Sequence, residues 1–333
     1  GVLAAIGIAY FVFEKKKSVP GIVSVLLIAG LCFALPSYSF AFWQSDITLE
    51  DESIYNYLQV KETDESVVLS TNVAFGVQSI MMKGGGLTGM YYDYALAAPM
   101  MAEDCRDVLI LGLGTGTFAE QCLEYFPGCS VTGVEIDEKI VALSREYFGL
   151  PEEVEAVVGD GRAYLTDSGM YDVIMVDAYQ DITIPFQMSS VEFFTEVYEH
   201  LKPGGVMVVN MSMRSESEGS MNEYLMDTIK SVFPYAWTVR VSGGTNLELF
   251  ATADEDALAR FEQRRSEVPG DYAAIMQRVD DGLEAVEGGD YILTDDKAPV
   301  ELLGMAVLDE IIANELDVLR DQIAENGIMS LLE

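Results

Sequence analysis

The stretch of residues 107–137 constrains the fold of this chain more than any other. It begins with a short apolar run at 108–111, continues with glycines at 112, 114 and 116, and then has a helical pattern at about 117–125. Such a run is typical of a buried parallel strand, and the glycines allow backbone N–H groups to approach a ligand at the helix N-terminus. The stretch therefore predicts the start of a nucleoside-binding βαβ unit.

The type of nucleoside follows from the spacing of the glycines and from the next acid. A second apolar run at 130–134 ends in Glu135, which is placed to hold the hydroxyls of a ribose. A dinucleotide site requires glycine at the sixth position of the turn, where this chain has Thr117. The pattern instead favours an S-adenosylmethionine type of ligand, bound by Gly112, Gly114, Gly116 and Glu135.

The composition excludes several classes of function. A net charge of −36 argues against binding of nucleic acid, which needs clustered Lys and Arg. His200 is the sole histidine and the four cysteines form no C-x-x-C pair, so we expect neither a metal site nor a Ser-His-Asp triad. The acidity suits a cationic substrate, but it also suits a protein from a generally acidic proteome.

The N-terminal region predicts a membrane segment. Residues 21–43 carry no charge and are long enough to cross a hydrocarbon core of about 30 Å. We expect this segment to be the end of a longer polytopic region. Lysines at 15, 16 and 17 favour the cytoplasm for the preceding loop, which would put the following domain outside. The supply of an adenosyl donor favours a cytoplasmic domain, and we give this argument the greater weight.

The remaining pattern predicts an α/β protein with a Rossmann-like, methyltransferase-type sheet. A small antiparallel β domain precedes this sheet, and the N-terminal transmembrane segment precedes both. The expected parts are a membrane region at 1–45, a β-strand domain at 46–100, a nucleoside-binding catalytic domain at 101–255 and a helical extension at 256–333. Strands are expected at 57–60, 66–70, 75–81, 108–111, 130–134, 155–158, 171–176 and 206–210, followed by an antiparallel pair at 237–241 and 247–253.

Acids follow several of these strands. Glu135, Asp160, Asp177 and Asp181 lie at the carboxyl ends of strands or just beyond them, where an open α/β sheet binds its ligands. We interpret Glu135 as a ribose ligand and Asp160, with Gly161, as a ligand of the adenine. Asp177 and Asp181 would face the reacting centre. The alternative for any one of these acids is a helix cap.

These motifs together resemble the spermidine synthase (polyamine aminopropyltransferase) family over roughly residues 53–253. The resemblance is carried by the glycine turn and by the segments 91–100, 134–137, 159–161, 171–177 and 201–205. The combination of an apolar segment, such a domain and the later residues 293–301 resembles the membrane-fused branch of the family.

The resemblance implies transfer of an aminopropyl group from decarboxylated S-adenosylmethionine to a diamine such as putrescine. Asp177 would be the base, and Tyr91 and Asp181 would bind the diamine. Gln78 matches a glutamine that contacts the nucleoside, and Asn56 stands where the family usually has glutamine. The family also suggests a homodimer.

Three positions depart from the family pattern. Thr115 replaces an acid that binds the donor's aminopropyl nitrogen, and Asp177 and Asp181 are one residue farther apart than the family's two acids. A substrate-binding tyrosine has no counterpart near Ser242. Two alternatives therefore stay open. One is a methyltransferase that uses intact S-adenosylmethionine, and the other is a non-catalytic domain that senses a nucleoside or a polyamine.

Overall fold

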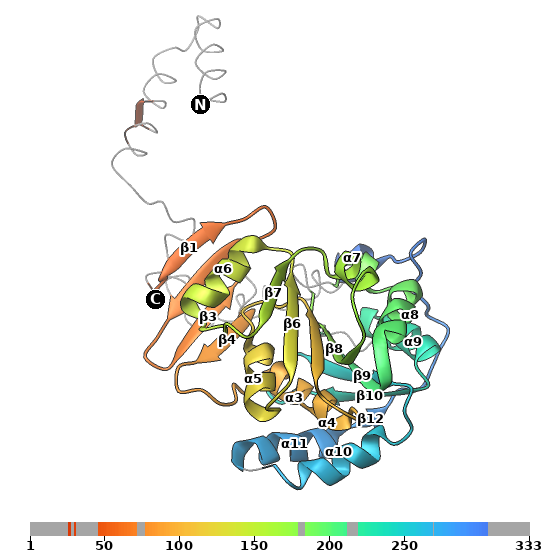
Figure 1. Ribbon diagram of the computed structural model, residues 1–333. Helices are drawn as coiled ribbons and strands as arrows, with labels where there is room; N and C mark the ends of the chain where they lie inside the picture. Colours follow the sequence, from red (N-terminus) through yellow and green to blue (C-terminus); the bar gives the residue numbers. More distant parts are fainter. Residues whose placement is uncertain are drawn as a thin grey trace, which may run out of the picture.

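A computed structural model describes residues 26, 27, 30, 46–71, 77–178, 184–211, 219–268 and 270–305 (Figure 1). The predicted membrane segment at 21–43 lies almost wholly outside these residues, as do Asp181 and the chain beyond 305. Within the described residues, no helix is both long enough and apolar enough to cross a membrane. The membrane location of this chain therefore stays a prediction.

A small antiparallel sheet precedes the main fold, as predicted. Its four strands run in the order β1 (Leu49–Glu52), β2 (Tyr57–Glu62), β3 (Ser66–Ser70) and β4 (Ser79–Met82). The strands expected at 57–60 and 66–70 are present, whereas the sequence did not predict β1. Leu58, Val60 and Leu69 pack on Ile140 and Leu143 of α6 (Glu138–Tyr147). The helix α6 lies beside the small sheet (Figure 1), and this apolar contact joins the small sheet to the main fold.

The main sheet has eight strands in the described residues and contains the predicted nucleoside-binding unit. Its order is β12-β10-β11-β9-β8-β5-β6-β7. The strands are β5 (Asp107–Leu111), β6 (Ser130–Glu135), β7 (Glu155–Val158), β8 (Tyr171–Val176), β9 (Leu201–Met211), β10 (Tyr235–Arg240), β11 (Leu247–Thr252) and β12 (Glu284–Ala285). The five neighbouring strands β9, β8, β5, β6 and β7 are parallel to one another. The predicted antiparallel pair β10–β11 extends the sheet beyond β9. The α/β Rossmann-like fold is thus confirmed.

Two details of the sheet differ from the predictions. The turn expected at 202–205 lies inside β9, because Tyr171 pairs with Leu201 whereas Val173 pairs with Val206, and the intervening residues bulge. The edge strand β12 was not predicted, since two residues show no periodicity.

Helices cover both faces of the main sheet (Figure 1). One face carries α3 (Tyr91–Ala95), α4 (Ala97–Met101), α5 (Thr117–Tyr125), α10 (Ala257–Arg265) and α11 (Gly270–Gly282). The other carries α7 (Gly161–Thr166), α8 (Val191–His200) and α9 (Met221–Val232). Parallel strands buried on both faces explain the continuous apolar runs of the sequence.

The proposed domain boundaries at residues 45, 100 and 255 stay predictions.

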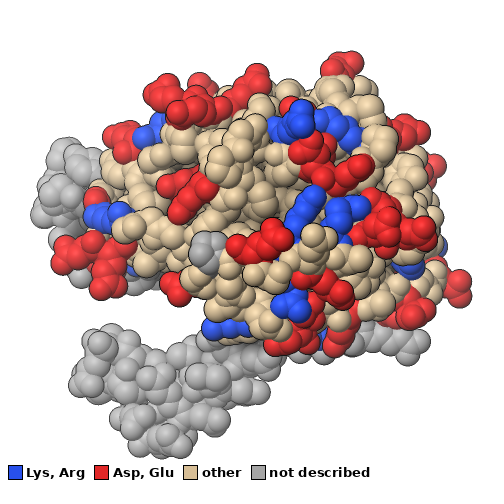
Figure 2. All heavy atoms as spheres, turned by 60° about the horizontal axis from the view of Figure 1, so that its bottom comes forward, with Lys and Arg blue, Asp and Glu red and all other residues tan. Residues whose placement is uncertain are grey.

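The helix α10 is bound to the end of α4 by polar as well as apolar contacts. Arg264 of α10 donates hydrogen bonds to the carbonyl oxygens of Ala102 and Glu103, at the C-terminus of α4. Figure 2, which views the molecule from the side of α10 and α11, shows Lys and Arg side chains lying among the more numerous Asp and Glu. Arg265 and Asp280 form one such ion pair, at 2.7 Å.

The segment 293–301 also has a structural role. The Asp295 carboxylate accepts hydrogen bonds from both terminal nitrogens of Arg162 at 2.8 Å, and the Leu293 carbonyl accepts one from the N–H of Val191. These bonds tie the loop before residue 300 to α7 and to the start of α8.

The glycine turn has the backbone that its sequence predicts. Gly112, Gly114 and Gly116 have φ angles of 94°, 55° and 87°, which side chains with a Cβ rarely adopt. At Gly112 the space is restricted as well, because a Cβ there would lie 2.4 Å from the carbonyl oxygen of Asp177. The turn after β5 and the residue after β8 are therefore in direct backbone contact.

We expect Gly112→Ala to destabilise the protein more than Gly128→Ala. Gly128 has a similar φ of 96°, but a Cβ there meets no atom within 4 Å, so this control isolates the effect of φ. The control should cost about 1 kcal/mol, and Gly112→Ala about 3 kcal/mol or more, since Asp177 must also move. Thermal unfolding followed by circular dichroism measures both. Equal decreases in Tm would show that the close contact does not matter.

Candidate active site

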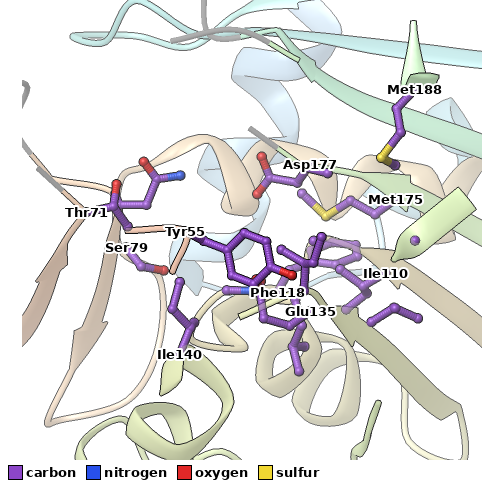
Figure 3. Close-up of a pocket in the computed structure, with 18 of the residues that line it drawn as sticks. Tyr55, Thr71, Ser79, Ile110, Phe118, Glu135, Ile140, Met175, Asp177 and Met188 are labelled. Atoms are coloured by element: carbon purple, nitrogen blue, oxygen red, sulfur yellow. The ribbon is translucent and has the colours of Figure 1, made fainter. Parts of the chain in front are cut away.

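A pocket lies between the small sheet and the carboxyl ends of the central parallel strands (Figure 3). Nine of the eleven predicted site residues line it: Asn56, Gln78, Tyr91, Gly112, Gly114, Glu135, Asp160, Gly161 and Asp177. Gly116, the N-cap residue of α5, does not. Asp181 lies outside the described residues. The ring of Tyr55, which the sequence analysis did not select, also points into the pocket (Figure 3).

Glu135 lies between the glycine turn and α6. One of its carboxylate oxygens accepts a hydrogen bond from the N–H of Gly114 at 2.9 Å, and the other from the N–H of Asp137 at 3.1 Å. Burial raises the pKa of Glu135, although these two N–H groups act in the opposite direction. Each oxygen keeps a lone pair for a further donor, so the carboxylate can accept the hydroxyls of a ribose.

Asp137 attaches the small sheet to this end of the pocket. Its Oδ2 accepts hydrogen bonds from Ser53 Oγ at 2.5 Å and from Asn56 Nδ2 at 2.9 Å. Its Oδ1 accepts the N–H of Lys139 and so caps α6. Asn56 thus lines the pocket while its amide group holds Asp137. One sequence signal points to this role, namely the position of Asp137 ahead of a helical pattern.

Asp160 caps a helix, as the alternative interpretation of the strand-end acids allowed. Its Oδ1 accepts the N–H of Ala163 in the first turn of α7. The same residue lines the pocket together with Gly161. Capping occupies one carboxylate oxygen, so the two interpretations do not conflict.

Asp177 is the most perturbed acid of the pocket lining. Its Oδ2 accepts the hydroxyl of Tyr91 at 2.5 Å, and its Oδ1 accepts Nδ2 of Asn210 at 2.7 Å. Burial raises the pKa of Asp177 to about 7, with a smaller contribution from the Glu135 charge, while the two hydrogen bonds lower it. A carboxylate that exchanges a proton near neutral pH, fixed by two donors, is suited to general-base catalysis.

Asn210 is a site residue that the sequence analysis missed. It lies near the carboxyl end of β9, immediately before Met211. The strand-end rule that selected the acids would also have selected Asn210, had it been applied to amides.

Thr115, which the family resemblance predicts to replace an acid, has a structural role here. The residue is buried, and its hydroxyl lies 2.6 Å from Ser79 Oγ and 3.3 Å from Thr117 Oγ1. Thr117 in turn donates to the carbonyl of Ile80 at 3.0 Å. These hydroxyls join β4 to the glycine turn, and Thr115 does not line the pocket.

Comparison with known proteins identifies the family. Residues 90–252 match the spermine/spermidine synthase domain. The chain is 49% identical to a protein of Bifidobacterium longum named "Probable polyamine aminopropyl transferase", over 97% of this chain and 77% of that protein. This chain belongs to the polyamine aminopropyltransferase family. Another member, the polyamine aminopropyltransferase of Vibrio vulnificus, is 30% identical over 63% of this chain and 72% of its own length.

Solved structures from the same family share the fold. A probable spermidine synthase from Corynebacterium glutamicum superimposes with a TM-score of 0.57 at 20% identity, over 74% of this chain and 99% of that chain. Spermidine synthase from Thermotoga maritima gives a TM-score of 0.53 at 19% identity, over 65% and 75% of the two chains. These structures support the fold, and the family predicted from the sequence is confirmed by the domain match and the 49% identical relative.

The raised pKa of Asp177 predicts a specific dependence of stability on pH. Between the ordinary pKa near 4 and the folded-state pKa near 7, the folded protein holds a proton that the unfolded chain has lost. Stability should therefore fall as pH rises through this range, by about 4 kcal/mol in total. Asp177→Asn removes this titration.

The test compares the Tm of the wild type and of Asp177→Asn between pH 5 and pH 8. The Tm of the variant should increase relative to the wild type as pH rises, and the difference should become constant above pH 8. Parallel curves would contradict a raised pKa.

Proposed function

We propose that this protein transfers the aminopropyl group of decarboxylated S-adenosylmethionine to a diamine such as putrescine. The observation that carries the proposal is Asp177, a half-buried carboxyl beside the glycine turn, held by Tyr91 and Asn210, with a pKa of about 7. Membership of the family supports it.

The nucleoside would occupy the end of the pocket away from Asp177. There Glu135 would accept the ribose hydroxyls, and Asp160 and Gly161 would contact the adenine. Apolar residues such as Phe118 and Ile140 line the same region and would cover the faces of the base (Figure 3). This placement leaves the sulfonium and its aminopropyl arm directed towards Asp177.

The reaction needs one neutral amine, whereas a diamine carries two protons at neutral pH. Asp177, once ionised, would accept a proton from the attacking ammonium group. The nitrogen lone pair then forms a bond to the methylene carbon beside the sulfonium, and the carbon–sulfur bond breaks with its electrons passing to sulfur. The products are a secondary ammonium ion and the neutral thioether 5′-methylthioadenosine, with the released proton on Asp177.

Methyl transfer from intact S-adenosylmethionine is the second candidate. The observation that favours it is Thr115, because a hydroxyl at this position exerts no charge repulsion on the donor's carboxylate. A methyltransferase and an aminopropyltransferase would bind the same adenosine, so the two functions differ in the donor's side chain. A purely sensing domain would not require a base, and the two hydrogen bonds that position Asp177 favour catalysis.

We further propose that residues 21–43 anchor the protein in a membrane, with the catalytic part on the cytoplasmic side, and that the protein acts as a homodimer. The uncharged run supports the membrane anchor. The family resemblance supports the dimer, and the need for a supply of the adenosyl donor supports the cytoplasmic side.

The full chain, incubated with decarboxylated S-adenosylmethionine and putrescine, should release equal amounts of spermidine and 5′-methylthioadenosine, measured by mass spectrometry. Because the base must be ionised, kcat/KM should increase with pH up to about 7 and then become constant. Asp177→Asn should lower kcat by at least about 100-fold and leave the affinity for 5′-methylthioadenosine nearly unchanged. Equal loss of turnover and affinity would instead identify Asp177 as a binding or folding residue.

A further inference from the structure

Glu248 is a buried carboxyl that the sequence analysis did not select. It is the second residue of β11 and is 0% exposed. Neither of its carboxylate oxygens has a hydrogen-bond partner in the part of the chain that the structure describes. Burying a carboxyl without a partner costs free energy, and native proteins rarely accept this cost outside functional sites.

The position of Glu248 connects it to the proposed base. Glu248 lies directly opposite Asn210 in the antiparallel pair β9–β11, so the two side chains project from the same face of the sheet. Asn210 donates to Asp177 through Nδ2 and accepts Nδ2 of Asn246 through Oδ1 at 2.8 Å. The amide of Asn210 is thus occupied by these neighbours, and Glu248 lies beside it.

Electrostatic interactions also link Glu248 to Asp177 and Tyr91. Burial raises the pKa of Glu248 well above its usual value, and the Asp177 charge adds to the effect. Glu248 in turn contributes to the raised pKa of Tyr91. No Lys or Arg is among the described charges that shift the pKa values of Asp177, Glu248 and Tyr91. The region around Asp177 therefore favours a cation.

The strand order shows which part of a substrate would reach Glu248. Along the edge of the sheet the order is β6, β5, β8, β9, β11, which places Glu135, the glycine turn, Asp177, Asn210 and Glu248 in that sequence. Asp177 and Tyr91 line the nucleoside pocket, whereas Glu248 does not. Glu248 thus lies beyond the proposed base, on the side away from the nucleoside.

We propose that Glu248 determines acceptor specificity by binding the second ammonium group of an α,ω-diamine, while Asp177 faces the amine that reacts. This inference rests on the proposed function. When the diamine binds, Glu248 ionises and releases its proton to solvent, so that the buried carboxylate and the ammonium ion form a neutral pair. A monoamine lacks the group that Glu248 binds, and the site should therefore prefer diamines.

The test compares 1,4-diaminobutane with 1-aminobutane as acceptors for the full chain, with decarboxylated S-adenosylmethionine as donor. The isosteric variant Glu248→Gln should raise the KM for 1,4-diaminobutane at least tenfold, with a smaller effect on kcat and none on the KM of the donor. The preference for diamine over monoamine in kcat/KM should fall by a similar factor. Glu284→Gln, which removes one exposed charge from β12 of the same sheet, should change none of these values.

A calorimetric titration gives a readout that does not depend on turnover. In the presence of 5′-methylthioadenosine, 1,4-diaminobutane should bind the wild type and bind Glu248→Gln at least tenfold more weakly. If Glu248→Gln does not fold, Glu248→Asp keeps the charge on a shorter side chain and should give an intermediate KM.

Two results would overturn the proposal in distinguishable ways. An active wild type with unchanged KM and unchanged diamine preference in a folded Glu248→Gln would make Glu248 a structural carboxyl only, and the proposed function would stand. A wild type that neither binds nor uses 1,4-diaminobutane would remove the proposed function and this inference together.

Discussion

The contact between the glycine turn and the residue after β8 is the constraint on which the site depends. The N–H of Asp177 donates to the carbonyl of Leu111 at 2.8 Å, and Gly112 has no Cβ to separate the two segments. The loop that would hold the donor and the carboxyl that would act as base are thereby placed on neighbouring strands at a fixed separation. A reaction between two bound molecules requires such positioning, since misplacement by about 1 Å can cost about 100-fold in rate.

Hydrogen bonds of hydroxyl and carboxylate groups also fix the small sheet against the glycine turn and the end of β6. Thr115 and Thr117 join β4 to the glycine turn, while Asp137 holds the segment before β2 through Ser53 and Asn56. The pocket is consequently formed by two sheets whose relative position is fixed by polar contacts at the turn and by apolar packing on α6. In this setting the Thr115 side chain has a structural use.

The sequence predicted the parts of the fold that repeat along the chain and missed those that depend on distant partners. Continuous apolar runs identified β5, β6 and β8, because parallel strands buried on both faces allow no alternation. The edge strand β7 is partly exposed and was identified by the glycines that follow it. The acidic and partly exposed β1 gives no such signal. The strand-end rule placed Glu135, Asp160 and Asp177 in one pocket. Asn210 also lies at a strand end, but it is an amide and the rule was applied only to acids. Glu248 could not be assigned to the site in this way, since its significance comes from the pairing of β9 with β11.

The central claim is that the pocket accepts a donor whose side chain ends in an ammonium group and carries no carboxylate. Calorimetric titration of the full chain with decarboxylated and with intact S-adenosylmethionine, in parallel, tests it most directly. The buried acids around Asp177 predict tighter binding of the decarboxylated form. Tighter binding of intact S-adenosylmethionine would contradict the account and favour methyl transfer, and binding of neither would indicate a family fold without the family's chemistry.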